Sequence, residues 1–195
     1  MDSEPLRRAS IHQRRRLHFL PDSPYLVPHI DPVAHVGMVL NAYGFGNHED
    51  AKSRTNGELA TRDMGAEVAQ LFKEFSLLGC EAKPMSSLSR GQQYKTALTA
   101  MIALDRELWL LDEPFASGMD PLGINAFKRH ARHASQRGKT IVYTTQILEI
   151  VESFSDQVLV LNAGELVAAG SLDEVRGLAT ETKSLQGFFE QFRPD

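Results

Sequence analysis

Short apolar runs alternate with helical patterns in the second half of the chain. Residues 108–111 and 140–145 are typical of buried strands, because each is a run of apolar or β-branched residues. Between them, Asp120 and Pro121 are the residue types of a helix N-cap and first helical position, and we expect a helix to about residue 137. Strands that alternate with helices predict an α/β domain with a parallel sheet.

After these strands the pattern predicts a short helix and then a hairpin. The hairpin strands are residues 158–161 and 165–169, joined by an Asn-Ala-Gly turn. Ser171 and Glu174 have the spacing of a capping box, which predicts a last helix from that point.

The first half of the chain is less regular. A short β-like run, Leu17–Leu20, is followed by four prolines within residues 21–32, which exclude a regular helix or a central strand there. Apolar spacing predicts helices near residues 36–43 and 67–78. We therefore expect a mostly helical insert before Pro84.

Composition limits the class of protein. The 195 residues are 42% hydrophobic and 24% charged, with a net charge of −4 that gives no basic field for nucleic acid. The single cysteine, Cys80, excludes an internal disulfide and favours a reducing compartment. No apolar run approaches the ~18 residues of a membrane helix. The basic residues 1–16 are interpreted as a solvated arm, in preference to a lipid-binding, phosphate-binding or transit segment. These features predict a soluble intracellular protein.

Asp112 and Glu113 are the sharpest candidates for chemistry. They follow the predicted strand 108–111, at the end where open α/β sheets bind ligands. One carboxylate can hold Mg²⁺ and the other can take a proton from water. Alone, such a pair also fits a solvated turn.

Ser89 and Gly91 stand at the start of the helix upstream of that strand, and Ser89 with Gln92 has capping-box spacing. A helix N-terminus with a serine hydroxyl and a glycine amide can bind an anion, and glycine lets a phosphate approach the backbone. A well-capped helix without a ligand has the same pattern.

Together these segments resemble the ATPase domain of ATP-binding cassette (ABC) transporters, in its exporter-like branch. The segments that carry the resemblance are the signature motif (88–92), the Walker B strand (108–113), the D-loop (117–120), the Q-loop (Pro21-Asp22), Gln146 at the switch-histidine position, and the hairpin with its following turn (162–171). The resemblance covers about residues 17–175. It implies a partial P-loop NTPase fold, with a helical subdomain at about 30–90.

The resemblance also implies a role for each candidate. Asp112 would hold Mg²⁺ through water, and Glu113 would be the general base for the attacking water. The residues implied to contact ATP held by a partner subunit, or to lie at the dimer interface, are Ser89, Gly91, Gln92 and Asp120.

The chain departs from the family pattern at two site positions. Gln146 can donate a hydrogen bond to a phosphate but cannot carry a proton as histidine does, which puts hydrolysis in question. Asp22 is shorter than the usual glutamine or glutamate, although it can still approach Mg²⁺ or its waters.

A larger departure is the lack of a P-loop, G-x-x-x-x-G-K-S/T, in the sequence. The closest match, residues 46–53, places Glu49 and Asp50 where phosphates would lie, and we interpret it as chance. Only twenty residues precede Pro21. We therefore expect a truncated or degenerate N-terminal part, weak ATP binding by the chain alone, and exposed apolar surface beside an open sheet edge.

The expected organisation is a basic arm (1–16), a truncated ABC ATPase domain (17–180) and a tail (181–195). The resemblance implies an ATP-binding and ATP-hydrolysing transporter subunit with ATP and Mg²⁺ as cofactors. It would act at the cytoplasmic face of the membrane with transmembrane permease subunits and a second ATPase subunit, and without nucleic acid. The alternatives are an inactive partner that supplies the signature motif in trans, or a non-catalytic scaffold.

Overall fold

The computed structural model describes residues 10–44, 63–179 and 184–191. The chain forms two compact units, residues 1–144 and 145–195. None of the helices in the described ranges is both long enough and apolar enough to cross a bilayer.

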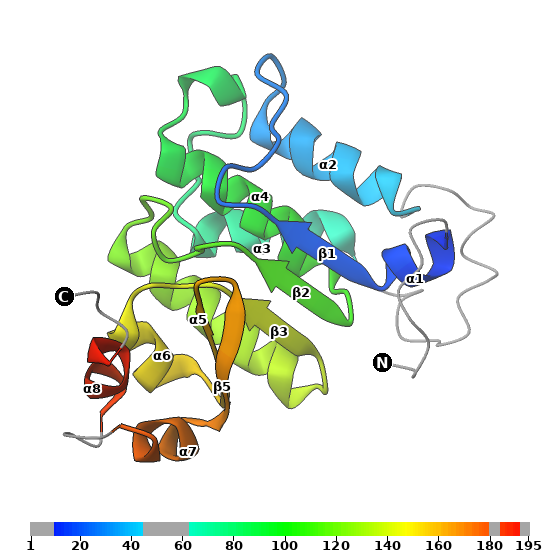
Figure 1. Cartoon of the computed structure of the whole chain (residues 1–195). Helices are drawn as coiled ribbons and strands as arrows, with labels where there is room; N and C mark the ends of the chain where they lie inside the picture. Colours follow the sequence, from blue (N-terminus) through cyan, green and yellow to red (C-terminus); the bar gives the residue numbers. More distant parts are fainter. Residues whose placement is uncertain (1–9, 45–62, 180–183, 192–195) are drawn as a thin grey trace. The chain divides into compact units, whose positions relative to one another are not determined.

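A parallel sheet is the centre of the first unit (Figure 1). Its strands, in spatial order, are β1 (Leu17–Leu20), β2 (Leu108–Leu111) and β3 (Thr140–Tyr143). Both pairings, β1 with β2 and β2 with β3, are parallel and in register over four residues. The predicted α/β fold with a parallel sheet is therefore confirmed.

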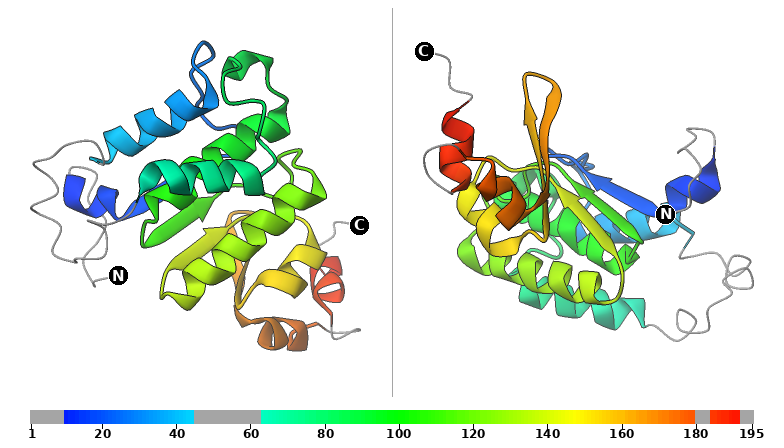
Figure 2. Two further views of the ribbon diagram at one scale, coloured as in Figure 1. Left: turned by 180° about the vertical axis from the view of Figure 1, so that it is seen from behind. Right: turned by 60° about the horizontal axis from the view of Figure 1, so that its bottom comes forward.

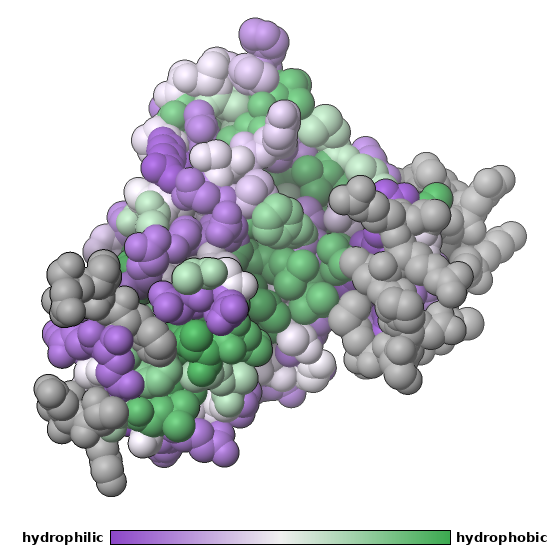
Figure 3. All heavy atoms as spheres, viewed as in Figure 1, coloured by the Kyte–Doolittle hydropathy of each residue, from purple (hydrophilic) through white to green (hydrophobic). Residues whose placement is uncertain are grey.

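The two faces of this sheet differ. Trp109 and Leu111 point into the core, with 1% and 3% of their surface exposed, and the helices of the unit cover that face (Figure 2). On the opposite face, Phe19 and Val142 are 54% and 47% exposed. Figure 3 shows hydrophobic side chains over the sheet in this region. The expected exposed apolar surface is present, although parallel sheets are usually covered on both faces.

Among the described residues of the first unit, three of the four longer helices pack around the fourth, α4 (Arg90–Leu104). The four are α2 (Pro32–Ala42), α3 (Met64–Glu74), α4 and α5 (Pro121–Gln136), and two short helices are α1 (Ile11–Arg15) and the 3-10 helix η3 (Met85–Ser87). Twelve of the fifteen residues of α4 are buried, because α2, α3 and α5 pack against it and the sheet lies beside it. The helix that carries the signature motif is thus the core of the unit.

Helix starts follow the capping side chains. α2 begins four residues before the predicted helix 36–43, because Asp31 caps it and Pro32 occupies its first turn. Asp63 likewise caps α3 by accepting the N–H of Ala66. The helix begins at Met64, three residues before the predicted start at residue 67. The chance P-loop match at residues 46–53 lies outside the described residues.

The described residues of the second unit form a hairpin and three short helices. Its elements are α6 (Leu148–Phe154), β4 (Gln157–Asn162), β5 (Glu165–Ser171), α7 (Leu172–Gly177) and α8 (Leu185–Glu190). β4 and β5 are antiparallel, so the predicted hairpin is confirmed. The Ser171–Glu174 capping box is formed at the start of α7. Val160, Val175 and Leu185 are among the buried residues that pack together in this unit.

Candidate functional site

The acid pair Asp112 and Glu113 lies directly after β2, at the carboxyl end of the sheet. The hydroxyl of Thr144, which follows β3, donates to Oδ1 of Asp112 at 2.7 Å and accepts the backbone N–H of Glu113 at 2.9 Å. The two strands run parallel, so their ends coincide and one hydroxyl reaches both acidic residues. Sequence reasoning missed Thr144, although a hydroxyl near the carboxyl end of the predicted strand 140–145 was the available signal.

The backbone at Glu113 is unusual. Its φ of 46° lies in the left-handed region, which costs energy for a residue with a side chain. Such conformations gather at functional sites, where the surrounding structure holds them in place. Here the bond from the Glu113 N–H to Thr144 is part of that hold.

Asp112 has the chemistry of a magnesium ligand. It is partly exposed, and Mg²⁺ is usually held by one or two carboxylates together with waters and substrate phosphates. Within the described ranges, no group of three or more His, Cys, Asp or Glu side chains could hold a metal ion by themselves. Asp112 therefore fits Mg²⁺ that keeps waters or phosphate as its other ligands, and it does not fit a closed protein cage.

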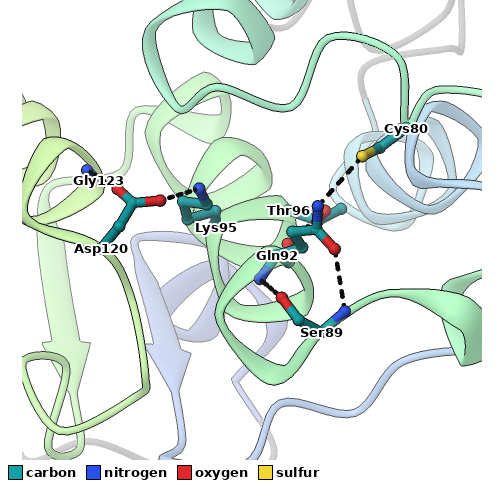
Figure 4. Close-up of polar contacts among 7 residues, drawn as sticks. All are labelled: Cys80, Ser89, Gln92, Lys95, Thr96, Asp120 and Gly123. Carbon is teal, nitrogen blue, oxygen red and sulfur yellow. Dashed lines mark hydrogen bonds and ion pairs between the residues drawn. The ribbon is translucent and has the colours of Figure 1, made fainter.

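The N-terminus of α4 is closed by the predicted capping box (Figure 4). Ser89 Oγ accepts the N–H of Gln92 at 3.2 Å, and Gln92 Oε1 accepts the N–H of Ser89 at 3.0 Å. The Gln92 amide also donates to Sγ of the buried Cys80 at 3.4 Å. The amide oxygen and the amide nitrogen of Gln92 thus both have hydrogen-bond partners within the chain. Ser89, in contrast, is exposed, and its hydroxyl can still donate to a ligand.

Gly91 is buried against the backbone of the D-loop. A Cβ at position 91 would lie 2.4 Å from the carbonyl oxygen of Gly118, so a side chain does not fit there. Gly118 itself has a φ of 79°, which favours glycine. The two glycines let the start of α4 and the D-loop pack at backbone contact.

A charged pair fixes the same two segments. Lys95, on α4, is 4% exposed at its side chain and contacts Oδ2 of Asp120 at 2.8 Å (Figure 4). Asp120 Oδ1 accepts the N–H of Gly123 at 2.7 Å and so caps α5. The Lys95 bond first, and then the Gly123 bond, lower the pKa of Asp120 below its usual value. We call α4, the D-loop and the start of α5 the signature framework, since these contacts hold them together.

Asp22 lies in the segment after β1 and contacts the first residue of α4. Arg90 donates to Asp22 Oδ1 at 2.6 Å, and both side chains are partly exposed. An arginine at a helix N-terminus opposes the helix dipole, and the Asp22 carboxylate offsets that charge. The structure thus joins the predicted Q-loop residue to the signature helix, and its approach to Mg²⁺ stays a prediction.

Gln146 belongs to the second unit, where it is exposed between β3 and α6. Its predicted role at the switch position stays a prediction. The sites brought together within the first unit are the acid pair with Thr144 and the signature framework.

An acid pair beyond the central strand of a parallel sheet, with a serine-capped helix fixed to the loop that follows, places the chain in the P-loop NTPase fold class. The sequence model described as "ABC transporter" matches residues 1–116, more than half of the chain. The chain therefore belongs to the ABC transporter family, as the signature, Walker B and D-loop motifs predict.

Curated relatives agree with this assignment. The chain is 27% identical over 163 residues to the ABC-type transporter ATP-binding protein EcsA of Bacillus subtilis, covering 84% of this chain and 60% of EcsA. It is 34% identical over 129 residues to the nickel import ATP-binding protein NikO of Rhodobacter capsulatus, covering 63% of this chain and 50% of NikO. The chain thus spans about half the length of the curated relatives it matches.

Solved structures share the fold. A structure of the ATP-binding subunit of an ABC transporter has a TM-score of 0.76 at 25% identity, covering 92% of this chain and 69% of that one. The cbiO1 protein of Clostridium perfringens, described as part of the ABC transporter complex cbiONQ, has a TM-score of 0.60 at 22% identity, covering 85% of this chain and 61% of that one. The second likeness concerns the fold alone.

Proposed function

We propose that this chain acts in the ATP-binding subunit of an ABC transporter, and that its signature framework completes an ATP site on a second ATPase subunit. The observation that carries this proposal is the exposed Ser89 at the mouth of a fifteen-residue helix, fixed to the D-loop by the Gly91–Gly118 contact and the Lys95–Asp120 pair. A surface fixed by these contacts is suited to binding a phosphate group of ATP that another chain holds.

The proposed chemistry follows from the residues of the signature framework and from those at the carboxyl ends of the strands. The α4 N-terminus carries a partial positive charge, and the Ser89 hydroxyl can donate to a phosphate oxygen. At the strand end, Asp112 would hold Mg²⁺, which neutralises phosphate charge when bound. Glu113 would accept the proton of the attacking water, with its backbone held by Thr144. Gln146 would contribute a hydrogen bond to the phosphate without carrying a proton.

The P-loop of the completed site lies outside these 195 residues. They contain no G-x-x-x-x-G-K-S/T, so two copies of residues 1–195 alone would present two signature surfaces and no P-loop. The name of cbiO1 places that protein in a transporter complex, and by the same analogy this chain would bind permease subunits at the cytoplasmic face of the membrane. Its sequence predicts an exporter, whereas NikO is named for nickel import. Transport assays in both directions distinguish these alternatives.

Recovery of the complex in the presence of Mg-ATP and vanadate tests the proposal. The tagged chain is purified from its source cells with and without nucleotide, and co-purifying ATPase subunits are identified. We expect nucleotide-dependent recovery of a P-loop-bearing ABC ATPase with the wild-type chain. Ser89→Arg should abolish this recovery, because it fills the phosphate position.

Ser86→Arg is the matched control, since Ser86 is also an exposed serine just before α4, and it should leave recovery unchanged. If Ser89→Arg is recovered with the ATPase as well as wild type, the trans role is wrong. A non-catalytic scaffold, the alternative from another class, predicts recovery that depends on neither nucleotide nor Ser89. Tight binding of Mg-ATP by the isolated chain would contradict the weak binding expected of these residues alone, and the trans role would still be decided by Ser89→Arg.

A further inference from the structure

A cavity of about 620 Å³ lies at the amino ends of the sheet strands, the end opposite to the acid pair. Three of the residues that line it directly precede a strand: Arg16 before β1, Glu107 before β2 and Lys139 before β3. α1, which ends at Arg15, supplies His12 and Arg15 to the same cavity (Figure 1). Because the strands are parallel and in register, side chains that are far apart in the chain meet at this edge.

The lining of this cavity carries more positive than negative charge. Four of its residues have a permanent positive charge and two have a carboxylate. In that order, these residues are Arg15, Arg16, Arg106, Lys139, Asp105 and Glu107. The net charge of the whole chain is −4, so the positive excess is a local feature. An anion is therefore the expected kind of ligand.

Both carboxylates of the cavity are bound to cations of this chain. Nε and Nη2 of Arg16 donate to the Glu107 carboxylate at 2.7 to 3.1 Å. Lys139 Nζ lies 3.0 Å from Oδ1 of Asp105, and Arg137 donates to the same oxygen at 2.7 Å. The two carboxylates thus hold the cations in place, and their own charge is largely offset.

The loop that carries Arg106 is also fixed. The Arg106 carbonyl oxygen accepts the indole N–H of Trp109 at 3.1 Å. The Arg106 guanidinium lies over the ring of Tyr43, with 5.1 Å between Cζ and the ring centroid. The preceding residue, Asp105, ends α4 with a left-handed φ of 49°. Cations that are already held in place bind an anion with a smaller loss of conformational entropy than mobile ones.

Arg15 differs from the other cations of the cavity. It is exposed, and among the described residues none forms a hydrogen bond or ion pair with its guanidinium. A guanidinium can bind a phosphate group through two parallel hydrogen bonds. Arg15 is therefore available to a phosphate that enters a cavity whose other cations are fixed.

We propose that this cavity binds a compound that carries two linked phosphate groups. Three of its four cations are arginines, which favours phosphate over a simple inorganic anion. Its volume lies within the range of small-ligand pockets. The sequence favoured a solvated arm for residues 1–16, whereas the bonds of Arg16 to Glu107 place the end of that arm in the cavity wall. The site shares no residue with the acid pair or the signature framework, so it is independent of the proposed function.

Isothermal titration of inorganic pyrophosphate into the full chain, at physiological salt and without divalent metal, tests the proposal. Wild type should bind with a Kd below about 1 mM. Arg15→Gln should bind about tenfold more weakly, because charge-assisted hydrogen bonds are lost. Glu107→Gln should bind about threefold more tightly, because it removes a negative charge from the cavity wall. Opposite effects of two exposed substitutions would not arise from a general loss of folding.

Arg14→Gln is the matched control. Arg14 is the preceding residue of α1 and is exposed, but it does not line the cavity. This variant should bind pyrophosphate within about twofold of wild type, because solvent and salt screen its charge. The proposal is overturned if wild type does not bind, if Arg14→Gln and Arg15→Gln lose binding equally, or if Glu107→Gln fails to tighten it.

Vesicles distinguish a soluble ligand from a lipid headgroup. The chain is sedimented with phosphatidylcholine vesicles that contain or lack cardiolipin, whose headgroup carries two phosphates. Cardiolipin-dependent sedimentation that Arg15→Gln weakens and pyrophosphate competes with would identify a lipid headgroup as the source. Pyrophosphate binding without such sedimentation would identify a soluble compound.

Discussion

Two sets of carboxylates in the first unit have opposite environments. Asp120 has one oxygen bonded to Lys95 and the other to the N–H of Gly123, so both are used to hold the D-loop against α4 and to cap α5. Beyond the central strand, the Thr144 hydroxyl donates to the Asp112 carboxylate and accepts the backbone N–H of Glu113, and both acidic residues are partly open to solvent. Asp120 therefore holds the signature framework together, whereas Asp112 and Glu113 are available to bind a ligand.

This contrast predicts that stability and ligand binding depend on different residues of the first unit. Substitutions in the signature framework should act mainly on the free energy of unfolding. Substitutions at the strand end should act mainly on ligand binding. The following predictions test that separation.

The largest effect on stability is expected at Gly91. Gly91→Ala brings a Cβ within 2.4 Å of the Gly118 carbonyl oxygen, which is backbone and cannot turn away. We expect a loss of about 3 kcal/mol in the free energy of unfolding, measured by urea denaturation. Gly37→Ala, in α2 with no atom within 4 Å of the new Cβ, should be neutral or slightly stabilising. Equal stability of the two variants would show that the D-loop does not pack on α4 in this way.

The Lys95–Asp120 pair should respond unequally to removal of each partner. Asp120→Asn keeps the N-cap but leaves the buried Lys95 ammonium without its counter-ion, which should cost about 2 kcal/mol. Lys95→Met removes the buried charge and leaves a carboxylate that is 49% exposed, so the cost should be about 1 kcal/mol or less. Urea denaturation of both variants measures the difference. A larger loss for Lys95→Met would contradict the assigned burial.

Thr144→Val should disturb the strand end more than the framework. It removes the donor to Asp112 and the acceptor for the Glu113 N–H, at a cost of about 1 kcal/mol in stability. Binding of Mn²⁺, the probe for the candidate Mg²⁺ site, should also fall in an electron paramagnetic resonance titration, because the Asp112 carboxylate loses its orientation. Thr144→Ser keeps the hydroxyl and should retain binding. If the valine variant binds Mn²⁺ normally, Thr144 does not orient Asp112.

The last prediction concerns acid pH and Glu74, the final residue of α3, outside the signature framework. Burial alone would raise the pKa of Glu74, but hydrogen bonds from Gln70, Arg129 and His130 lower it to about 2, against 4.5 in an unfolded chain. Because the folded pKa is the lower one, this stabilisation is full above about pH 5 and is lost as the pH falls towards 2. Glu74→Gln should flatten the acid side of the stability profile. Glu165→Gln, at an exposed hairpin position, should leave it unchanged.

Local signals in the sequence predicted most of the fold. The strands at 108–111 and 140–143, the Asp120 N-cap and the Ser89–Gln92 capping box depend on neighbours within a few residues, and each is confirmed. The predicted burial of the second strand is wrong, because β3 has no buried residue and Val142 is 47% exposed on the open face of the sheet. Periodicity did not locate the start of α2, because Asp31 sets it and lies in a proline-rich segment. The division at Thr144 was not foreseen, since no composition change marks it.

The site was predicted less completely than the fold. The sequence identified the acid pair and the serine-capped helix, but the residues that support them lie far apart in the chain. Lys95 reads as an ordinary helical lysine until Asp120 is placed beside it. Gly91 was interpreted as room for a phosphate, whereas the carbonyl of Gly118 gives it a separate reason to be glycine. Such tertiary pairs have no local pattern in one sequence.

The single cysteine of the chain offers a direct reporter for the start of α4. Cys80 is 5% exposed, and its sulfur accepts a hydrogen bond from the side-chain amide of Gln92. The same Gln92 side chain completes the capping box of α4. A thiol reagent can therefore react only when this corner of the molecule opens. The rate of modification would measure how often the start of α4 opens, with no introduced label. A partner subunit bound at Ser89 should lower this rate.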